Sequence, residues 1–285
     1  MLSLKRGFAC KLCMQIVSRL EAVKPQPSIQ WPDVAKYIRY QQDSSSCYGI
    51  VERGDVHEIE GDLFGAHRLT GTTRPLAELR LLNPCRPSKI VAVGRNYKSH
   101  LGNRSHPRHP EIFYKPLTAL QDPECPIVIP RDATDVHYEG EMVVVVGKRL
   151  KGATPEEARA AVFGVTCGND VTDRNWQYGE QRDVQWWRAK GADTFAPAGP
   201  AIVSGVNPDD LLLQTRLNGE LVQRERTSDF IFDCATFLSW ISSWVTVLPG
   251  DIVFTGTPGA TRRLSSGDVV EVEVEGVGVL RNPVA

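Results

Sequence analysis

The hydrophobic residues of this chain occur mostly in short runs, which glycine, proline and polar residues separate. Runs of about four to eight residues that are rich in β-branched side chains are typical of strands. We expect strands in these segments: residues 37–40, 48–52, 56–59, 89–94, 127–130, 138–147, 211–217, 252–255 and 269–274. The valine-rich run at residues 138–147 predicts a buried strand, whereas residues 269–274 alternate valine with acid.

Turn and helix signals lie between these runs. Residues 53–55 predict a hairpin turn, and the Asn-Gly pair at residues 218–219 predicts a type I′ turn. One clear helix is expected over residues 154–162, with Thr154 as its N-cap and Glu157 at the capping-box position. Many short strands and few helices indicate a mostly β fold of the α+β kind, and not a doubly wound α/β sheet.

Changes in composition divide the chain into three parts. Residues 1–30 are expected to be a disordered extension, because they begin with a basic stretch that lacks acid and end in a proline-rich linker. The extension loosely resembles an organelle transit segment, and a start codon assigned too early explains it as well. Residues 31–85 are expected to form a small N-terminal domain and residues 86–285 a second, larger domain, with Pro84 and Pro87 at the boundary.

Composition and charge exclude several classes of function. The 285 residues include 33 basic and 34 acidic side chains, a net charge of −1, so no basic excess points to a nucleic-acid partner. No run of about eighteen apolar residues predicts a membrane span. The seven scattered cysteines are typical of reduced thiols, and the Cys10-x-x-Cys13 spacing is interpreted as chance. We therefore expect a cytoplasmic protein, or an organellar one if residues 1–30 are a transit segment.

Two glutamates stand one residue apart at the start of the valine-rich run. In a strand, Glu139 and Glu141 point to the same face, so their carboxylates repel unless one is protonated or a cation lies between them. A hard divalent ion satisfies such a pair, and Asp170 in the next polar cluster is a candidate third ligand. The alternative is a solvated pair on an edge strand, which the valine run disfavours.

Short motifs follow one another in a fixed order through most of the chain. They are VGRNY at 93–97 followed by His100, FYKP at 113–116, YEGE at 138–141, NDVTDR at 169–174, KGADTF at 190–195, PAGP at 197–200, LNGE at 217–220 and PGDIVFTGTP at 249–258. As a set these motifs resemble the fumarylacetoacetate hydrolase family. The resemblance covers residues 88–285, with a weaker match over residues 31–82.

The resemblance implies a mixed β-sandwich roll as the catalytic domain, preceded by a small N-terminal domain, in a homodimer. It implies that Glu139, Glu141 and Asp170 bind Mg²⁺, Mn²⁺ or Ca²⁺. The implied substrates are small 2-oxo and β-dicarbonyl carboxylic acids, which chelate the metal. A metal that stabilises an enolate agrees with this chemistry on physical grounds.

Further site residues follow from the same resemblance. Arg174, Gln177, Lys190 and Thr257 match the residues that contact the substrate, and Lys115 matches a cation that supports the carboxylates from behind. His100 and Lys190 are the implied catalytic residues, with His100 as the proton shuttle.

One position departs from the family pattern. Many members have a glutamate three residues after the histidine, whereas this chain has Asn103 after His100. An asparagine accepts no proton at neutral pH, so activation of water by a histidine–glutamate pair is in doubt, and Glu111 is the nearest substitute. The leading hypothesis is hydrolysis of a carbon–carbon bond in an acylpyruvate. The alternatives are an oxaloacetate decarboxylase or keto–enol tautomerase, and a metal-dependent 2-oxo acid binder without turnover.

Overall fold

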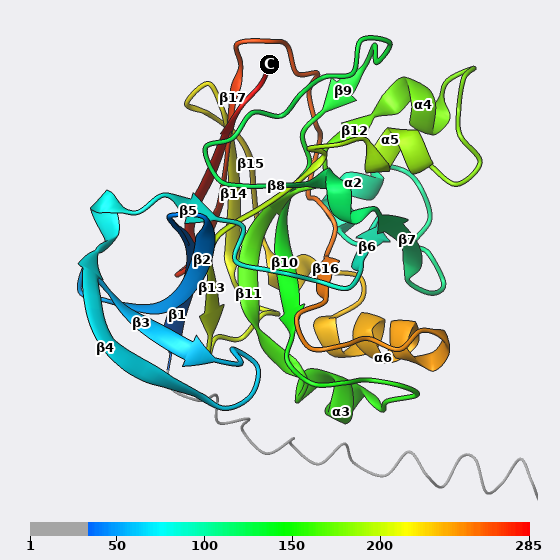
Figure 1. Ribbon diagram of the computed structural model, residues 1–285. Coiled ribbons are helices and arrows are strands. Elements are labelled where there is room, and N and C mark those ends of the chain that lie inside the picture. The colour runs from blue at the N-terminus through cyan, green and yellow to red at the C-terminus, as the bar shows by residue number, and fades with distance from the viewer. Residues whose placement is uncertain (1–33) are drawn as a thin grey trace, which may run out of the picture. The chain divides into compact units, whose positions relative to one another are not determined.

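The computed structural model describes residues 34–285 (Figure 1). The predicted extension at residues 1–30 and the Cys10-x-x-Cys13 pair lie outside the described residues, so these predictions stay open. Within the described part, no helix combines the length and hydrophobicity that crossing a membrane requires.

Strands dominate the described chain, which confirms the mostly β fold. They are β1 Ala35–Gln42, β2 Ser45–Glu52, β3 Asp55–Gly61, β4 His67–Pro75, β5 Leu81–Leu82, β6 Ile90–Gly94, β7 Glu111–Lys115, β8 Leu120–Gln121, β9 Val136–His137, β10 Gly140–Val146, β11 Val162–Asn169, β12 Thr172–Asp173, β13 Ala196–Ser204, β14 Leu212–Leu217, β15 Glu220–Arg226, β16 Ile252–Phe254, β17 Val269–Val274 and β18 Gly278–Pro283. The α-helices are α2 Lys98–Leu101, α3 Pro155–Arg159, α4 Arg174–Tyr178, α5 Trp187–Gly191 and α6 Cys234–Trp244. Three 3₁₀ turns complete the elements: η1 Leu76–Glu78, η2 Leu117–Ala119 and η3 Thr227–Asp229.

The large sheet has β10 near its centre. Its strand order is β4-β3-β2-β1-β13-β11-β10-β16-β6-β7, with β5 and β8 attached to β1 and β13. Every residue of β10 is buried. Met142, Val144 and Val146 enter one hydrophobic core and Val143 and Val145 enter another. This run is continuously apolar because both faces of the strand are covered.

A second sheet, in the order β15-β14-β17-β18, contributes to the first of these cores. Val270, Val272 and Val274 of β17 are buried, whereas the intervening Glu271 and Glu273 are partly exposed. The alternation of valine and acid in the sequence is the result of covering one face only. Residues 218–219 connect β14 to β15, and both have positive φ, as the predicted type I′ turn requires.

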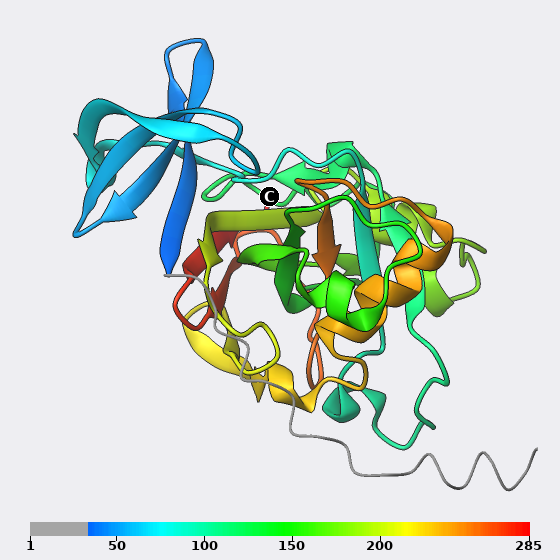
Figure 2. The same ribbon diagram turned by 90° about the horizontal axis from the view of Figure 1, so that it is seen from below.

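The N-terminal strands β1 to β4 form successive hairpins, and Figure 2 shows them curled into a group of their own. The turn between β2 and β3 has Arg53 at φ 52° and Gly54 at φ 92°, as the hairpin prediction requires. Strand β1 also pairs with β13, with Tyr37 opposite Ile202. Backbone hydrogen bonds therefore cross the predicted boundary near residue 85, and the two-domain division itself stays a prediction.

Two local predictions were wrong. Residues 127–130 do not form a strand: Ile127 makes one isolated bridge to Val284, and prolines that lack an N–H stand directly before the segment and at its end. The helix begins as predicted, with both hydrogen bonds of the Thr154 capping box, but it ends at Arg159. Val162 belongs to β11 instead, because pairing with β10 recruits it into the sheet.

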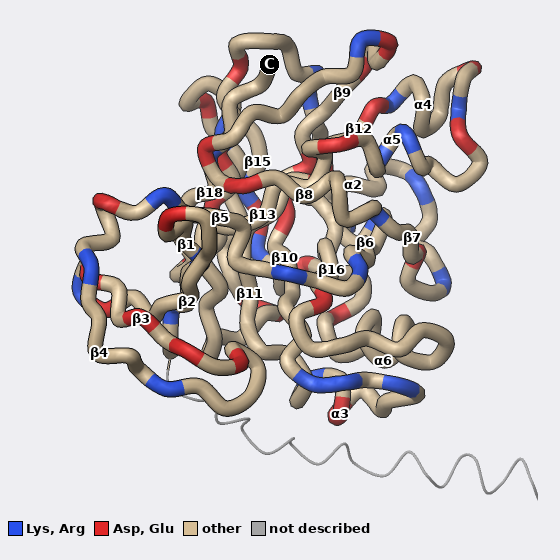
Figure 3. The backbone as a smooth tube through the Cα atoms, in the orientation of Figure 1, with Lys and Arg blue, Asp and Glu red and all other residues tan. Residues whose placement is uncertain are grey.

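Basic and acidic residues are interspersed along the described chain (Figure 3), as the near-zero net charge suggests. Most ion pairs of the described residues are partly exposed. The exceptions gather around the start of β10, where several charged side chains are almost completely buried.

Candidate functional site

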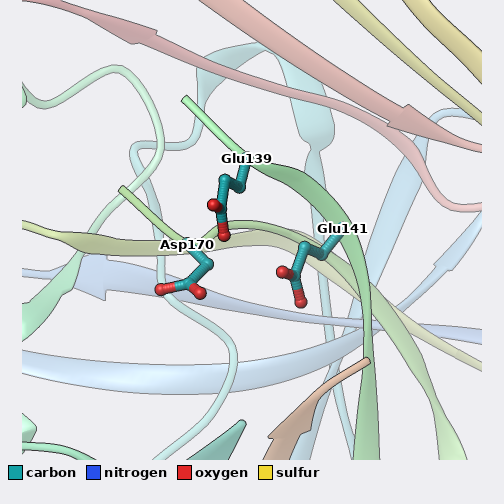
Figure 4. A group of neighbouring side chains, drawn as sticks. All are labelled: Glu139, Glu141 and Asp170. Carbon is teal, nitrogen blue, oxygen red and sulfur yellow. The ribbon is translucent and has the colours of Figure 1, made fainter. Parts of the chain in front are cut away.

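Three carboxylates converge where β10 begins and β11 ends (Figure 4). Glu139, Glu141 and Asp170 each offer an oxygen within 4.8 Å of the others, and their exposed fractions are 5%, 2% and 1%. The pairing of Gly140 with Asn169 brings the two segments together. The Asp170 N–H also donates to the Glu139 carbonyl at 2.9 Å, so the backbone itself sets the spacing of these side chains.

The glycine between the two glutamates is required by packing. A Cβ at Gly140 would lie 1.9 Å from the Thr215 Oγ1 and 3.1 Å from the Gln223 Oε1. The second sheet therefore closes tightly on this side of the strand, while Glu139 and Glu141 point to the other side. Close approach of this kind is a common reason for glycine inside a strand.

Three basic side chains surround two of the carboxylates. Lys115 Nζ lies 2.5 Å from Asp170 Oδ1, and Lys190 Nζ bridges Asp170 Oδ2 at 2.6 Å and Glu139 Oε2 at 2.7 Å. Arg174 Nη2 lies 2.5 Å from Glu139 Oε1. Burial by itself would raise the pKa of the Glu139 carboxyl. The positive charges of Arg174 and Lys190 lower this pKa by more than burial raises it, so it lies well below the usual range.

Glu141 has no such basic partner among the described residues. Its Oε2 accepts a hydrogen bond from the Gly256 N–H at 2.8 Å. Burial and the nearby Asp170 and Glu139 carboxylates raise the pKa of Glu141 well above its ordinary value. The carboxylate cluster is thus short of positive charge on the side of Glu141.

The donor set fits a hard divalent cation. Glu139, Glu141 and Asp170 are oxygen donors close enough for one ion, and carboxylate oxygens are what Mg²⁺, Mn²⁺ and Ca²⁺ prefer. An ion there also compensates the charge that Glu141 cannot share with a neighbouring base. No thiol or imidazole belongs to this cluster, so a soft transition metal is a poorer match.

His100 lies on α2 and lines the same pocket as the carboxylates. Its Nδ1 lies 2.6 Å from the Gly259 carbonyl oxygen, which can only accept, so Nδ1 carries the proton. The lone pair of a neutral His100 is therefore on Nε2. Burial lowers the pKa of His100 and outweighs the raising effects of the Glu139 carboxylate and of the hydrogen bond to Gly259, and the Arg174 and Lys190 charges lower the pKa as well. The imidazole is thus a neutral base at neutral pH.

The remaining predicted residues are held by hydrogen bonds around the carboxylates. Arg174 Nη1 donates to Gln177 Oε1 at 2.7 Å, one turn later on α4. Thr257 Oγ1 donates to the Gly140 carbonyl at 2.9 Å and accepts from Gln223 Nε2 at 2.9 Å. Gln223 was not predicted from the sequence, because only the pairing of the second sheet brings it to this position.

One pocket collects these groups in a space of about 360 Å³, part of which is open to solvent. The predicted residues that line it are His100, Glu139, Glu141, Asp170, Arg174, Gln177, Lys190 and Thr257. Lys115 does not line the pocket and contacts Asp170 from within the protein. The structure thus brings all the predicted site residues together, while their roles stay predictions.

Several other residues that line the pocket were not predicted. They are Val93, Gly94, Arg95, Phe113, Tyr178, Trp186 and Gly256. Arg95 and Phe113 stand inside two of the motifs described above, so their positions in these motifs could have identified them as residues of the site. Tyr178 and Trp186 carry no such signal, because they stand outside the motifs, Tyr178 at the end of α4 and Trp186 directly before α5.

The proposed substitute for the missing family glutamate is wrong. Glu111 does not line the pocket, and both of its carboxylate oxygens bind Arg95. Asn103 is exposed in the turn that follows α2 and does not line the pocket either. No acidic side chain of the described residues forms a hydrogen bond with His100.

The sequence matches two family models. Residues 89–285 match the model described as fumarylacetoacetate (FAA) hydrolase C-terminal, and residues 35–84 match the model described as Rv2993c-like, N-terminal. The first match begins and the second match ends close to the predicted boundary at Pro84 and Pro87.

Relatives with names span most of the chain. Protein Rv2993c of Mycobacterium tuberculosis is 45% identical over 235 residues, which are 80% of this chain and 87% of that protein. The oxaloacetate tautomerase FAHD2B, mitochondrial, of Bos taurus is 40% identical over 223 residues, 74% of this chain and 71% of that protein.

Solved structures of similar proteins have the same fold as this chain. The 2-hydroxyhepta-2,4-diene-1,7-dioate isomerase from Mycobacterium marinum superposes with a TM-score of 0.81 at 40% identity, covering 88% of this chain and 98% of that one. Together, the two family models extend over the strands that carry the pocket and over the N-terminal hairpins.

Proposed function

This chain belongs to the fumarylacetoacetate hydrolase family and is an enzyme of that family, and on this premise we propose that it interconverts the keto and enol forms of a small 2-oxo acid with the help of a divalent cation. The observation that supports this reaction most directly is the state of His100. It offers a free Nε2 lone pair in the pocket that the carboxylates line, and it lacks the acidic partner that would support activation of water.

Glu139, Glu141 and Asp170 are the residues that would hold the cation, with Mg²⁺ as our first choice. When bound, such an ion acts as a Lewis acid on the 2-oxo group. Lys190 and Arg174 keep their positive charge, because neighbouring carboxylates raise the pKa of each side chain against the opposing effect of burial. They are therefore suited to bind the carboxylate of the substrate.

His100 would move the proton. In the keto form, Nε2 accepts a proton from C3 of the substrate, so that the C3–H bond breaks and the electron pair moves toward the 2-oxo oxygen. The same proton is then delivered to that oxygen, which completes the enol. Nothing is consumed, so the reaction needs no water, oxidant or second substrate.

The names of relatives point in the same direction. Two of those described above are called an oxaloacetate tautomerase and a dienedioate isomerase. Both names describe the relocation of a proton in a 2-oxo or 2-hydroxy acid. Acylpyruvate hydrolysis, the leading hypothesis from sequence, additionally needs an activated water molecule, for which His100 lacks a carboxylate partner.

The test uses oxaloacetate and acetylpyruvate, each with Mg²⁺ and with excess chelator. We expect metal-dependent acceleration of the decay of enol oxaloacetate, followed by its ultraviolet absorbance, and no cleavage products in proton NMR spectra. Glu139→Ala is the blank. Cleavage of acetylpyruvate without accelerated tautomerisation would establish the hydrolase instead, loss of CO₂ from oxaloacetate would establish the decarboxylase, and bound metal without any turnover would favour the binder.

We propose a homodimer located in the cytoplasm as the setting of this activity. Family membership supports the dimer, and the odd number of cysteines supports a reducing compartment. Light scattering of the purified full chain tests the first proposal, and fluorescence microscopy of the tagged full chain tests the second.

A further inference from the structure

Arg95 occupies an unusual place at the pocket. It follows β6 directly and has φ 54°, a left-handed conformation that non-glycine residues adopt rarely. Backbone strain of this kind persists where the surrounding structure imposes it, often at functional sites. Trp186, which also lines the pocket, has φ 55°. Two large side chains are thus directed to the same pocket from strained backbone positions.

The hydrogen bonds of Arg95 leave one side of its guanidinium free. Nε donates to Glu111 Oε2 at 2.6 Å and Nη2 donates to Glu111 Oε1, so the side-on fork is occupied. Within the described residues, Nη1 donates no hydrogen bond. A guanidinium carries five N–H donors and can hold a second carboxylate through its two terminal nitrogens. Glu111 therefore orients Arg95 without using up its binding capacity.

The other cations of the site lie against the carboxylate cluster, where they are placed for the carboxylate of the 2-oxo acid head of the substrate. Lys190 and Arg174 bind Glu139, and Lys115 binds Asp170. Among the described residues that line the pocket, Arg95 is the cation that contacts none of the three carboxylates. An anionic group at a distance from the metal end of the pocket would meet this arginine first.

The wall beside Arg95 is aromatic. The Phe113 and Trp186 rings lie 5.7 Å apart between centroids, and the Tyr178 and Trp186 rings lie 6.0 Å apart, both edge to face. All three residues line the pocket. Phe113 and Trp186 are partly buried, whereas Tyr178 is exposed. An ion pair formed beside partly buried rings is screened less by water and salt than one on the open surface.

We propose that Arg95 is a specificity-determining residue that binds the distal carboxylate of the substrate, so that the site selects 2-oxo diacids over 2-oxo acids with a neutral tail. This inference rests on the proposed function and adds the substrate class to it. Glu111 acts as a positioning residue that holds the guanidinium in place and does not touch the substrate.

The experiment compares two substrates that share the 2-oxo acid head. Oxaloacetate ends in a carboxylate, and acetylpyruvate carries an acetyl group there. Arg95→Gln should lower kcat/KM for oxaloacetate about 10- to 100-fold, the usual effect of losing a charged hydrogen bond, mainly through KM. Tautomerisation of acetylpyruvate should change less than about threefold. Arg95→Lys, which keeps the charge without the fork, should fall between wild type and Arg95→Gln.

A binding measurement separates this inference from the proposed reaction. Calorimetry with L-malate and 2-hydroxybutanoate, in the presence of Mg²⁺, compares a distal carboxylate with a methyl group and requires no turnover. Arg95→Gln should weaken malate binding by the same factor and leave 2-hydroxybutanoate binding unchanged. Glu111→Gln should have a smaller effect in the same direction. Arg68→Gln, which removes a surface arginine paired with Glu60, is the matched control and should change nothing.

Equal losses for both members of either pair would overturn the proposal, because Arg95 would then act on the shared head of the ligand or on the fold. Unchanged malate binding in Arg95→Gln would overturn it as well. If the wild type turns over neither substrate, the proposed function fails, while malate and 2-hydroxybutanoate still decide the role of Arg95.

Discussion

The pocket has two walls that are built in different ways. The strand wall consists of Glu139, Glu141 and Asp170, and the helix wall consists of His100 on α2, Arg174 on α4 and Lys190 on α5. The strand wall is positioned by the pairing of β10 with β11 in the middle of the large sheet. The helix wall belongs to three helices of only four or five residues (Figure 1).

Helices this short are not stable by themselves, so side chains hold the helix wall in place. Asp173 caps α4 by accepting from the Trp176 N–H at 2.8 Å. Asp183 accepts from the N–H and side chain of Arg188 on α5. Under the proposed function, the two walls would divide the work: the strand wall would hold the cation rigidly, and the helix wall would supply the groups that contact and convert the substrate.

The largest effect is expected from the strand wall. Asp170→Asn removes a charged metal ligand and leaves Lys115 without its ion pair, so metal affinity should be lost and kcat/KM should fall about 10³-fold or more. Calorimetry with Mg²⁺ and the oxaloacetate assay measure the two effects. Full metal affinity in this variant would show that the strand wall is not the cation site.

A change in the helix wall should separate catalysis from metal binding. His100→Ala removes the proton shuttle, so kcat should fall about 10²- to 10⁴-fold. Mg²⁺ affinity should stay as in wild type, because His100 forms no hydrogen bond with the three carboxylates. If this variant loses its metal too, the two walls are not independent.

Packing behind the strand wall can be tested separately. Gly140→Ala places a Cβ against Thr215 Oγ1 and should destabilise the fold by about 1–3 kcal/mol, or roughly 2–4 °C in Tm per kcal/mol. Thr215→Ala in the same chain should recover part of this loss. Thr215 Oγ1 makes no hydrogen bond, so removing it costs little. Thermal unfolding of the single and double variants measures the coupling.

The acid limb of the pH profile reports on the helix wall. The pKa of His100 is lowered from 6.5, mainly by burial, and the base must be neutral to accept a proton. The rate should therefore stay level down to a pH below 6.5 and then fall about tenfold per pH unit, as for a single protonation. The control is His100→Ala, whose residual rate should lack this limb. A limb centred above 6.5 would contradict the environment described for His100.

The smallest effect is expected from a variant outside both walls, which serves as the control for general loss of stability. Thr154→Ala removes the capping box of α3, which does not line the pocket, and should cost about 1 kcal/mol of stability. Turnover and metal affinity should be unchanged. A loss of turnover in this variant would mean that general destabilisation, and not the chemistry of the walls, explains the other effects.

Much of the strand wall could be predicted from the sequence. The valine run required a strand buried on both faces, and period-two geometry then put Glu139 and Glu141 on one side of it. Asp170 was a candidate because it stands in the next polar cluster, and the resemblance supported it, although its distance in sequence hides its pairing with the glutamates. The helix wall was less accessible, because helices of one turn leave no periodic pattern and their positions depend on caps such as Asp173.

The sequence by itself determined the mostly β fold, the family, and the identity of the charged residues around the start of β10. Tertiary structure alone decided that Glu111 pairs with Arg95 and not with His100, that Gln223 reaches Thr257, and that residues 127–130 form no strand. The physical reason is the distance along the chain over which each kind of interaction acts. Strand periodicity, turns and caps act between near neighbours in the chain, whereas partners across sheets are chosen only when the whole core packs.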